Sequence, residues 1–168
     1  MIFKQSFGVF HLFGLFVLLG QIAPGPVVYG QTTAAELLER AELLLEQDDR
    51  DAALLQFKAV IEAGSSREWE AVYSAGVQLS NLYISRRQMD STLYVLDQVG
   101  ALADTWRIPA FEVKLRNYQG QTLKMLGQGS RAIRVFAGIL NQSAPYPEHV
   151  TVLHEYAVLK YQLENDAD

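Results

Sequence analysis

The sequence contains no cysteine, and this absence excludes two kinds of covalent chemistry. The chain can form no disulfide, and it can carry no lipid on an N-terminal cysteine, even in an oxidising compartment outside the cytoplasm. A domain of this length must therefore be stabilised by the packing of its side chains alone.

Groups that commonly carry catalysis are also scarce. Outside the first 30 residues the only histidines are His149 and His154, and a spacing of five sets them roughly 140° apart on a helix, too far for a shared metal ion. No serine stands beside a plausible base, and no G-x-x-x-x-G-K-[ST] phosphate loop occurs. The pattern formed by Gly127, Gly129 and Ala132 joins two predicted helices, whereas a nucleotide fold needs a strand before it. We therefore expect no enzymatic activity, no metal and no cofactor.

Basic residues are outnumbered by acidic residues, 14 against 19, which gives a net charge of −5 at pH 7. This balance argues against general nucleic-acid binding. The charges are unevenly spread, because residues 35–51 have a net charge of −5 and residues 107–134 a net charge of +5. The basic stretch would suit an acidic protein partner. Solvated charged faces and head-to-tail self-association of the two ends are the alternatives.

Residues 1–30 have the three parts of a secretory signal. Lys4 precedes an almost wholly apolar stretch at residues 7–19, and residues 21–30 are rich in proline and small side chains. We therefore expect the protein to be exported to the periplasm or secreted.

Cleavage after Gly30 is favoured, because Val28 and Gly30 supply the small side chains that signal peptidase requires before the cut. Gln31 would then begin a mature domain at residues 31–168. The alternative is an uncleaved inner-membrane anchor at residues 7–28, since roughly 20 apolar residues can span a bilayer. This segment is the only expected attachment to a membrane.

Beyond the N-terminal segment, apolar residues recur at helical spacing, and no alternating run of β-branched residues predicts a strand. Thr33 with Glu36 and Ser65 with Glu68 are capping-box pairs, which predict two helix starts. Pro109 suits the first turn of a later helix, where its missing N–H costs nothing. Together with the polar and glycine-containing breaks, these signals predict an all-α fold of about seven antiparallel helices.

Equivalent residues recur at a period near 40. Ala53, Thr92 and Ala132 hold the same position near the start of the second helix in each of three helix pairs, at separations of 39 and 40 residues. A large apolar residue follows each by four positions, and a small residue precedes each by twelve. The large residues are Phe57, Leu96 and Phe136, and the small ones are Ala41, Ser80 and Gly120. This repetition predicts helix pairs that bury their apolar faces against their neighbours.

The third pair resembles the tetratricopeptide repeat family. Gly120, Leu123, Gly127, Ala132 and Phe136 stand at the family's small, large, glycine, alanine and aromatic positions. The resemblance implies a right-handed α-solenoid of three helix pairs with a seventh helix as a C-terminal cap.

The resemblance extends over roughly residues 33–163. The chain departs from the family's usual period of about 34 residues and from its tryptophan position. In its longer period it is similar to the degenerate arrays of the extracytoplasmic regions of bacterial sensor proteins. The resemblance therefore implies an exported scaffold that binds a protein or peptide, or alternatively the extracytoplasmic part of a membrane signalling system.

One polar stripe is a candidate binding site. Lys114, Asn117, Gln121 and Lys124 are spaced i, i+3, i+7 and i+10, which places them on one side of a helix. In the tetratricopeptide family the first helices of the pairs line a concave groove, so the resemblance adds Asn81 of the second pair. Amides can bond a peptide backbone and lysines can meet its carboxylates. These five residues are the predicted peptide-binding residues.

Overall fold

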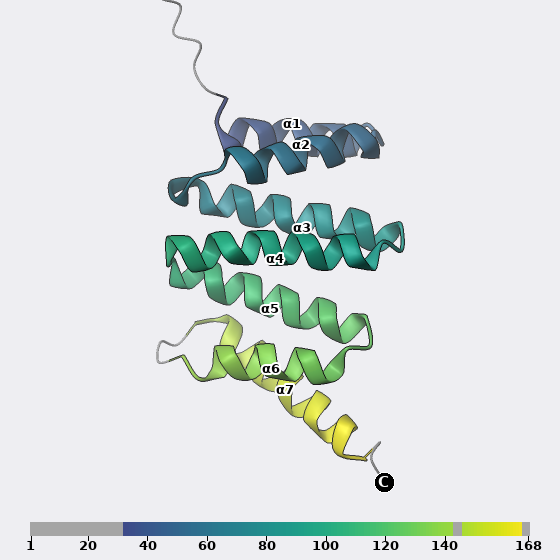
Figure 1. Ribbon diagram of the computed structural model, residues 1–168, viewed down its shortest axis with the longest axis vertical. Coiled ribbons are helices and arrows are strands. Elements are labelled where there is room, and N and C mark those ends of the chain that lie inside the picture. Colours follow the sequence, from purple (N-terminus) through teal and green to yellow (C-terminus); the bar gives the residue numbers. More distant parts are fainter. Residues whose placement is uncertain (1–31, 143–145, 166–168) are drawn as a thin grey trace, which may run out of the picture. The chain divides into compact units, whose positions relative to one another are not determined.

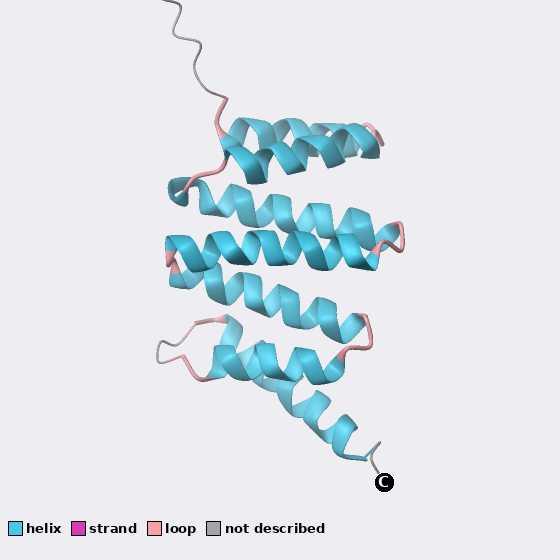
Figure 2. Ribbon diagram, viewed as in Figure 1, coloured by secondary structure: helices cyan, strands magenta, loops and turns pink. Residues whose placement is uncertain are grey.

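The computed structural model describes residues 32–142 and 146–165, so the predicted signal or anchor at residues 1–30 lies outside the described residues. The described residues form helices and no strand (Figures 1 and 2), which confirms the predicted all-α class for this part of the chain. The helices are α1 (Ala34–Glu46), α2 (Arg50–Ala63), α3 (Trp69–Ser85), α4 (Met89–Trp106), α5 (Pro109–Met125), α6 (Gly129–Leu140) and α7 (Glu148–Asn165), and a short 3₁₀ turn, η1 (Ser66–Glu68), precedes α3.

The local start signals of two helices are confirmed. The Thr33 hydroxyl accepts the backbone N–H of Glu36 at 3.2 Å, and the Glu36 carboxylate accepts the backbone N–H of Thr33 at 3.1 Å. This reciprocal pair satisfies two of the unpaired donors at the start of α1. Pro109 is the first residue of α5, where no helical hydrogen bond is lost.

The second predicted capping box is wrong. The Ser65 hydroxyl donates to one carboxylate oxygen of Glu68 at 2.8 Å and caps no backbone N–H. The other carboxylate oxygen accepts the backbone N–H of Ala34 at 2.8 Å, at the start of α1. The hydrogen bond from Ser65, followed by those from the α1 backbone, lowers the pKa of Glu68. Glu68 therefore connects the starts of α1 and α3 across 34 positions of sequence.

The turns within the three helix pairs share one geometry. Asp48, Arg87 and Gly127 adopt the left-handed conformation, with φ values of 58°, 58° and 73°. In each turn the next backbone N–H reaches back five residues, as in a Schellman motif. These bonds run from Asp49 to Leu44 (2.9 Å), from Gln88 to Tyr83 (2.9 Å) and from Gln128 to Leu123 (2.8 Å). The left-handed residues are 39 and 40 positions apart, the same spacing as in the repeat predicted from the sequence.

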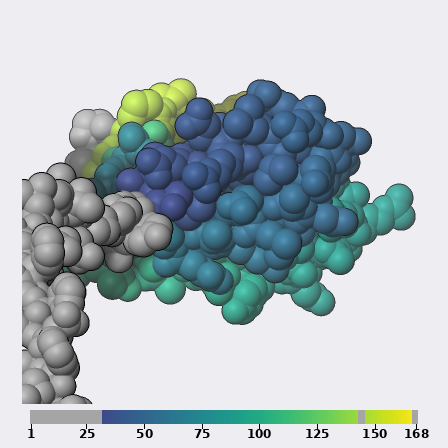
Figure 3. All heavy atoms as spheres, turned by 90° about the horizontal axis from the view of Figure 1, so that it is seen from above, coloured from purple at the N-terminus to yellow at the C-terminus, as the bar shows by residue number. Residues whose placement is uncertain are grey.

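Each helix packs against the next one along the chain, and the first helices of the pairs also contact one another. Thus α1 contacts α3, α3 contacts α5, and α5 contacts α7. Figure 1 shows α1 and α7 at opposite ends of this unit, and α1 and α2 form the surface seen end-on in Figure 3. One cluster of buried apolar side chains extends from α1 to α5, and a second lies among α5, α6 and α7.

Two glycines allow helices to approach closely. Gly120 of α5 lies against the ring of Phe136 from α6, and a Cβ at this position would meet three ring atoms. Gly64 ends α2 as predicted, but its φ of −65° is open to other residues. Its requirement is spatial, because a Cβ there would collide with the side chain of Val72 at the start of α3. The small and large residues identified in the third repeat therefore meet in space.

Candidate functional site

The predicted peptide-binding residues lie on two neighbouring helices that contact each other. Asn81 belongs to α3, and Lys114, Asn117, Gln121 and Lys124 belong to α5. We call the surface that carries them, together with the part of α7 that meets Lys124, the α3–α5–α7 face. The contacts of each residue show how this face is built.

Asn81 is joined to α5 through Tyr118. The Tyr118 hydroxyl donates to the Asn81 side-chain oxygen at 2.9 Å, and the carbonyl oxygen of Val77 lies 3.4 Å away. Burial raises the pKa of Tyr118, and the neighbouring Tyr73 raises it further, whereas a hydrogen bond with Thr122 lowers it. Burial and the negative charge of Glu148 likewise raise the pKa of Tyr73. This part of the face is therefore an aromatic and amide network between α3 and α5.

We expect the unfolding free energy to fall as the pH rises above 10. Tyr73 and Tyr118 have raised pKa values in the folded chain, so the unfolded chain releases their protons first. Their stabilising contribution is complete below pH 10 and is lost as the pH rises through the folded-state pKa values. Urea denaturation at pH 8, 10 and 11 would measure the loss, and Tyr118→Phe should make it smaller. An equal loss in Tyr118→Phe and the wild type would contradict the assignment to Tyr118.

Lys114 is held by an aromatic ring from the preceding helix pair. Its ammonium group lies 5.3 Å from the ring centroid of Trp69, within cation–π range. The Trp69 ring in turn contacts Phe111, with a centroid separation of 5.6 Å. Because Phe111 is fully buried, this chain of contacts ties the position of Lys114 to the core.

Asn117 and Gln121 bond each other along α5. The Gln121 amide donates to the Asn117 side-chain oxygen at 3.1 Å. No other side-chain hydrogen bond of these two residues occurs among the described residues, so the Asn117 NH₂ group and the Gln121 carbonyl oxygen keep their bonding capacity. Gln121 is exposed and Asn117 is half-buried. These amides are therefore the accessible hydrogen-bonding groups of the face.

Lys124 connects the face to α7. Its ammonium group forms an ion pair with Glu155, and the two side chains line an open hollow of about 310 Å³ together with Gln121 and Met125. The positive charge of the neighbouring region is also partly matched, because Arg116 pairs with Glu112 at 2.9 Å and with Asp104 at 3.4 Å. The basic excess at residues 107–134 is thus reduced where these acids approach.

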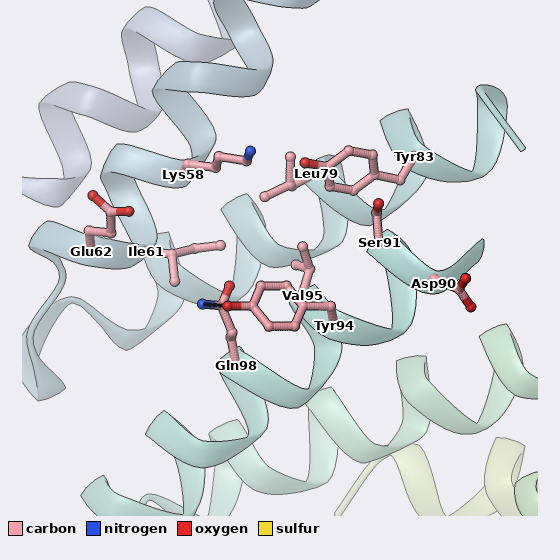
Figure 4. A pocket seen from close by; sticks show the side chains of 10 residues that line it. All are labelled: Lys58, Ile61, Glu62, Leu79, Tyr83, Asp90, Ser91, Tyr94, Val95 and Gln98. Carbon is pink, nitrogen blue, oxygen red and sulfur yellow. Dashed lines mark hydrogen bonds between the residues drawn. The ribbon is translucent and has the colours of Figure 1, made fainter. Parts of the chain in front are cut away.

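A second groove, which the sequence pattern did not identify, lies between α2 and α4 with α3 as its floor (Figure 4). Its volume is about 470 Å³. Buried Ile61, Leu79 and Val95 supply an apolar base, and the polar rim consists of Lys58, Glu62, Asp90, Ser91, Tyr94 and Gln98. The i, i+4, i+8 spacing of Asp90, Tyr94 and Gln98 was the available signal, but the groove forms only when three helices meet.

Within this groove, Tyr94 and Lys58 have different surroundings. The Tyr94 side chain is 63% exposed, and its hydroxyl accepts a hydrogen bond from Gln98 at 3.1 Å. The Lys58 ammonium lies 5.9 Å from the Tyr83 ring centroid and points toward the groove in Figure 4. The groove thus combines an apolar base with charges of both signs.

The histidines do not form a site together. The two ring nitrogens of His149 lie within hydrogen-bond distance of Tyr146 backbone atoms and of the Ile139 carbonyl oxygen, at 2.9 and 3.1 Å. His154 is exposed on α7. No group of three histidine, aspartate or glutamate side chains with metal-binding geometry occurs in the part of the chain that the structure describes.

None of the helices within residues 32–142 and 146–165 is both long and apolar enough to cross a membrane. No model of a known protein family matches the chain, and no curated protein matches it.

Proposed function

We propose that this protein is a helical-repeat scaffold, similar to tetratricopeptide arrays, that binds a segment of another protein on the α3–α5–α7 face and catalyses no reaction. The three equivalent turns at intervals of 39 and 40 residues support the repeat. The contacts of α1 with α3, α3 with α5 and α5 with α7 support a right-handed solenoid whose first helices line one surface. Export of the scaffold rests on residues 1–30 alone.

The observation that carries the proposal is the meeting of polar side chains from α3 and α5 on one face. Tyr118 fixes Asn81 between the helices, and Asn117 and Gln121 present unused donor and acceptor groups beside it. An extended peptide needs this combination, because each of its residues offers one N–H and one carbonyl group. Side chains that are already held in place also lose less entropy when a ligand binds.

The two lysines favour a segment that contains carboxylates. Lys114 stands over Trp69 and Lys124 pairs with Glu155, so both ammonium groups are positioned by other helices. A carboxylate of the partner could bond Lys114 from its solvent side, and another could compete with Glu155 for Lys124. Such contacts raise the association rate and the selectivity for an acidic partner.

Photocrosslinking in the source cells tests the scaffold function and the surface together. A photoreactive residue replaces Asn117 in one variant and Ser91, on the rim of the groove between α2 and α4, in a second. We expect a discrete protein adduct from the first, and we expect Lys114→Glu with Lys124→Glu to weaken binding of that partner roughly tenfold or more. Calorimetry with the identified partner segment would measure the change.

The two crosslinking positions separate the competing sites. An adduct from Ser91 alone would assign binding to the groove between α2 and α4, whose apolar base and exposed Tyr94 make it the second candidate surface. No adduct from either position would contradict the scaffold function. The matched variant Lys160→Glu, on an exposed part of α7, should leave the affinity within about twofold, because it removes a surface charge away from the predicted residues.

A further inference from the structure

The outward side of α7 carries an exposed apolar row, which we call the α7 row. It consists of Val150, Leu153, Ala157 and Tyr161, spaced i, i+3, i+7 and i+11. The three large side chains are 78%, 57% and 70% exposed. A cap at the end of a helical array is expected to be polar on its outward side. The α7 row departs from that expectation, and helices with apolar residues at alternating spacings of three and four usually pack against another helix.

The corresponding side of α5 is covered. Three residues that face inward on α7 follow three that face inward on α5 at a constant distance of 41 positions. Val152 follows Phe111, Tyr156 follows Leu115, and Leu159 follows Tyr118. With the same offset, Tyr161 corresponds to Gly120, which α6 covers with the ring of Phe136. Thus α7 presents to solvent the side that α5 presents to α6, and no described helix covers it.

We infer that a second copy of this chain covers the α7 row, with the two α7 helices antiparallel across a two-fold axis at Ala157. The symmetry of the row supports this occupant. Leu153 and Tyr161 lie four residues before and four residues after Ala157, so each Leu153 would face Tyr161 of the second copy. Ala157 would meet itself at the axis, where a small side chain lets two helices approach closely. The interface is isologous and therefore closes as a dimer.

The charge distribution agrees with this arrangement. Acidic residues are concentrated at residues 35–51, in α1 and α2, which lie at the opposite end of the unit from α7 (Figure 1). Contact through α7 keeps these acidic ends apart, although each chain has a net charge of −5. Beside the row, Lys160 and Glu164 lie 3.8 Å apart and offset each other. The α7 row is thus a surface that two negatively charged copies can bring together at low electrostatic cost.

The mass of the chain in solution tests the dimer. Residues 32–168 belong to one compact unit that contains both buried clusters, so a chain that begins at Gln31 is suitable for the measurement. Sedimentation equilibrium of this chain should give the mass of two copies. Leu153→Glu with Tyr161→Glu should raise the dissociation constant roughly a hundredfold or more, because each substitution places two charges in the apolar contact. Circular dichroism should remain unchanged, since both positions are exposed.

A matched substitution serves as the control. Leu55 of α2 is 65% exposed and lies away from α7, so Leu55→Glu should leave the dimer intact. Because the chain has no cysteine, Ala157→Cys introduces a single thiol at the predicted axis, and oxidation should link two copies. Three results would overturn the inference: a monomer at tens of micromolar, a dimer that Leu153→Glu with Tyr161→Glu does not weaken, or assemblies that grow with concentration, which indicate head-to-tail association.

Discussion

Replacing Phe136 by alanine is expected to lower the free energy of unfolding by about 3–5 kcal/mol. The Phe136 ring is fully buried and fills the space between α5 and α6 directly above Gly120. Removing it loses the transfer free energy of the ring and leaves a cavity that a glycine on the facing helix cannot fill. Chemical denaturation followed by circular dichroism measures the effect. A loss below about 1 kcal/mol would mean that the two helices do not meet at this point.

The facing residue provides a second variant in the same contact. A Cβ at position 120 would lie 2.7 and 2.8 Å from two atoms of the Phe136 ring, with a third atom closer still. Gly120→Ala should therefore destabilise the protein by about 1–3 kcal/mol, although alanine is the better helix former. Combining Gly120→Ala with Phe136→Leu should cost less than the sum of the two substitutions, since the smaller side chain makes room for the new methyl group.

Gly138 is the matched control for that substitution. It lies in α6, on the same helix as Phe136, but a Cβ there would meet no atom within 4 Å. Gly138→Ala should therefore stabilise the protein by up to about 1 kcal/mol through helix propensity alone. If both glycine variants shifted stability in the same direction, the close approach of Gly120 to Phe136 would be contradicted.

The parts of the fold that the sequence predicts are those determined by neighbours within one helix or turn. Thr33 and Glu36 form their reciprocal cap because both groups belong to the first turn of α1. The repeat of 39 and 40 residues reappears in the left-handed turn residues, because each turn must follow a helix of similar length. The pair Ser65 and Glu68 has the same local pattern as the first cap, yet Glu68 bonds the distant backbone of Ala34. Sequence spacing has no information about that competing donor.

The same distinction applies to the candidate site. Helical spacing predicts that Lys114, Asn117, Gln121 and Lys124 share one side of α5. It does not predict their partners on other helices, because Trp69 and Glu155 are 45 and 31 positions from the lysines that they contact. These partners decide which charges and amides remain available to a ligand. The groove between α2 and α4 was missed for the same reason, since no single helix has its apolar base.

Ser80→Ala is expected to raise the free energy of unfolding by about 1–3 kcal/mol. Ser80 occupies the repeat position that Ala41 and Gly120 hold in the other two pairs, and it is fully buried. Its hydroxyl has no hydrogen-bond partner among the described residues, so folding removes it from water without replacing the lost bonds. Alanine at this position removes that cost and is also the better helix former.

Thr92 shows why this effect belongs to an unsatisfied hydroxyl and not to every buried one. Thr92 is as buried as Ser80, but its hydroxyl donates to the Gln88 carbonyl oxygen at 3.1 Å. Thr92→Val should therefore lower the free energy of unfolding by about 0.5–1.5 kcal/mol, because it removes a hydrogen bond that is made. Denaturant titration of both variants under the same conditions should give shifts of opposite sign. A loss of stability in Ser80→Ala would show that the hydroxyl finds a partner, such as the carbonyl one helical turn earlier, and that the middle pair uses its serine as the outer pairs use alanine and glycine.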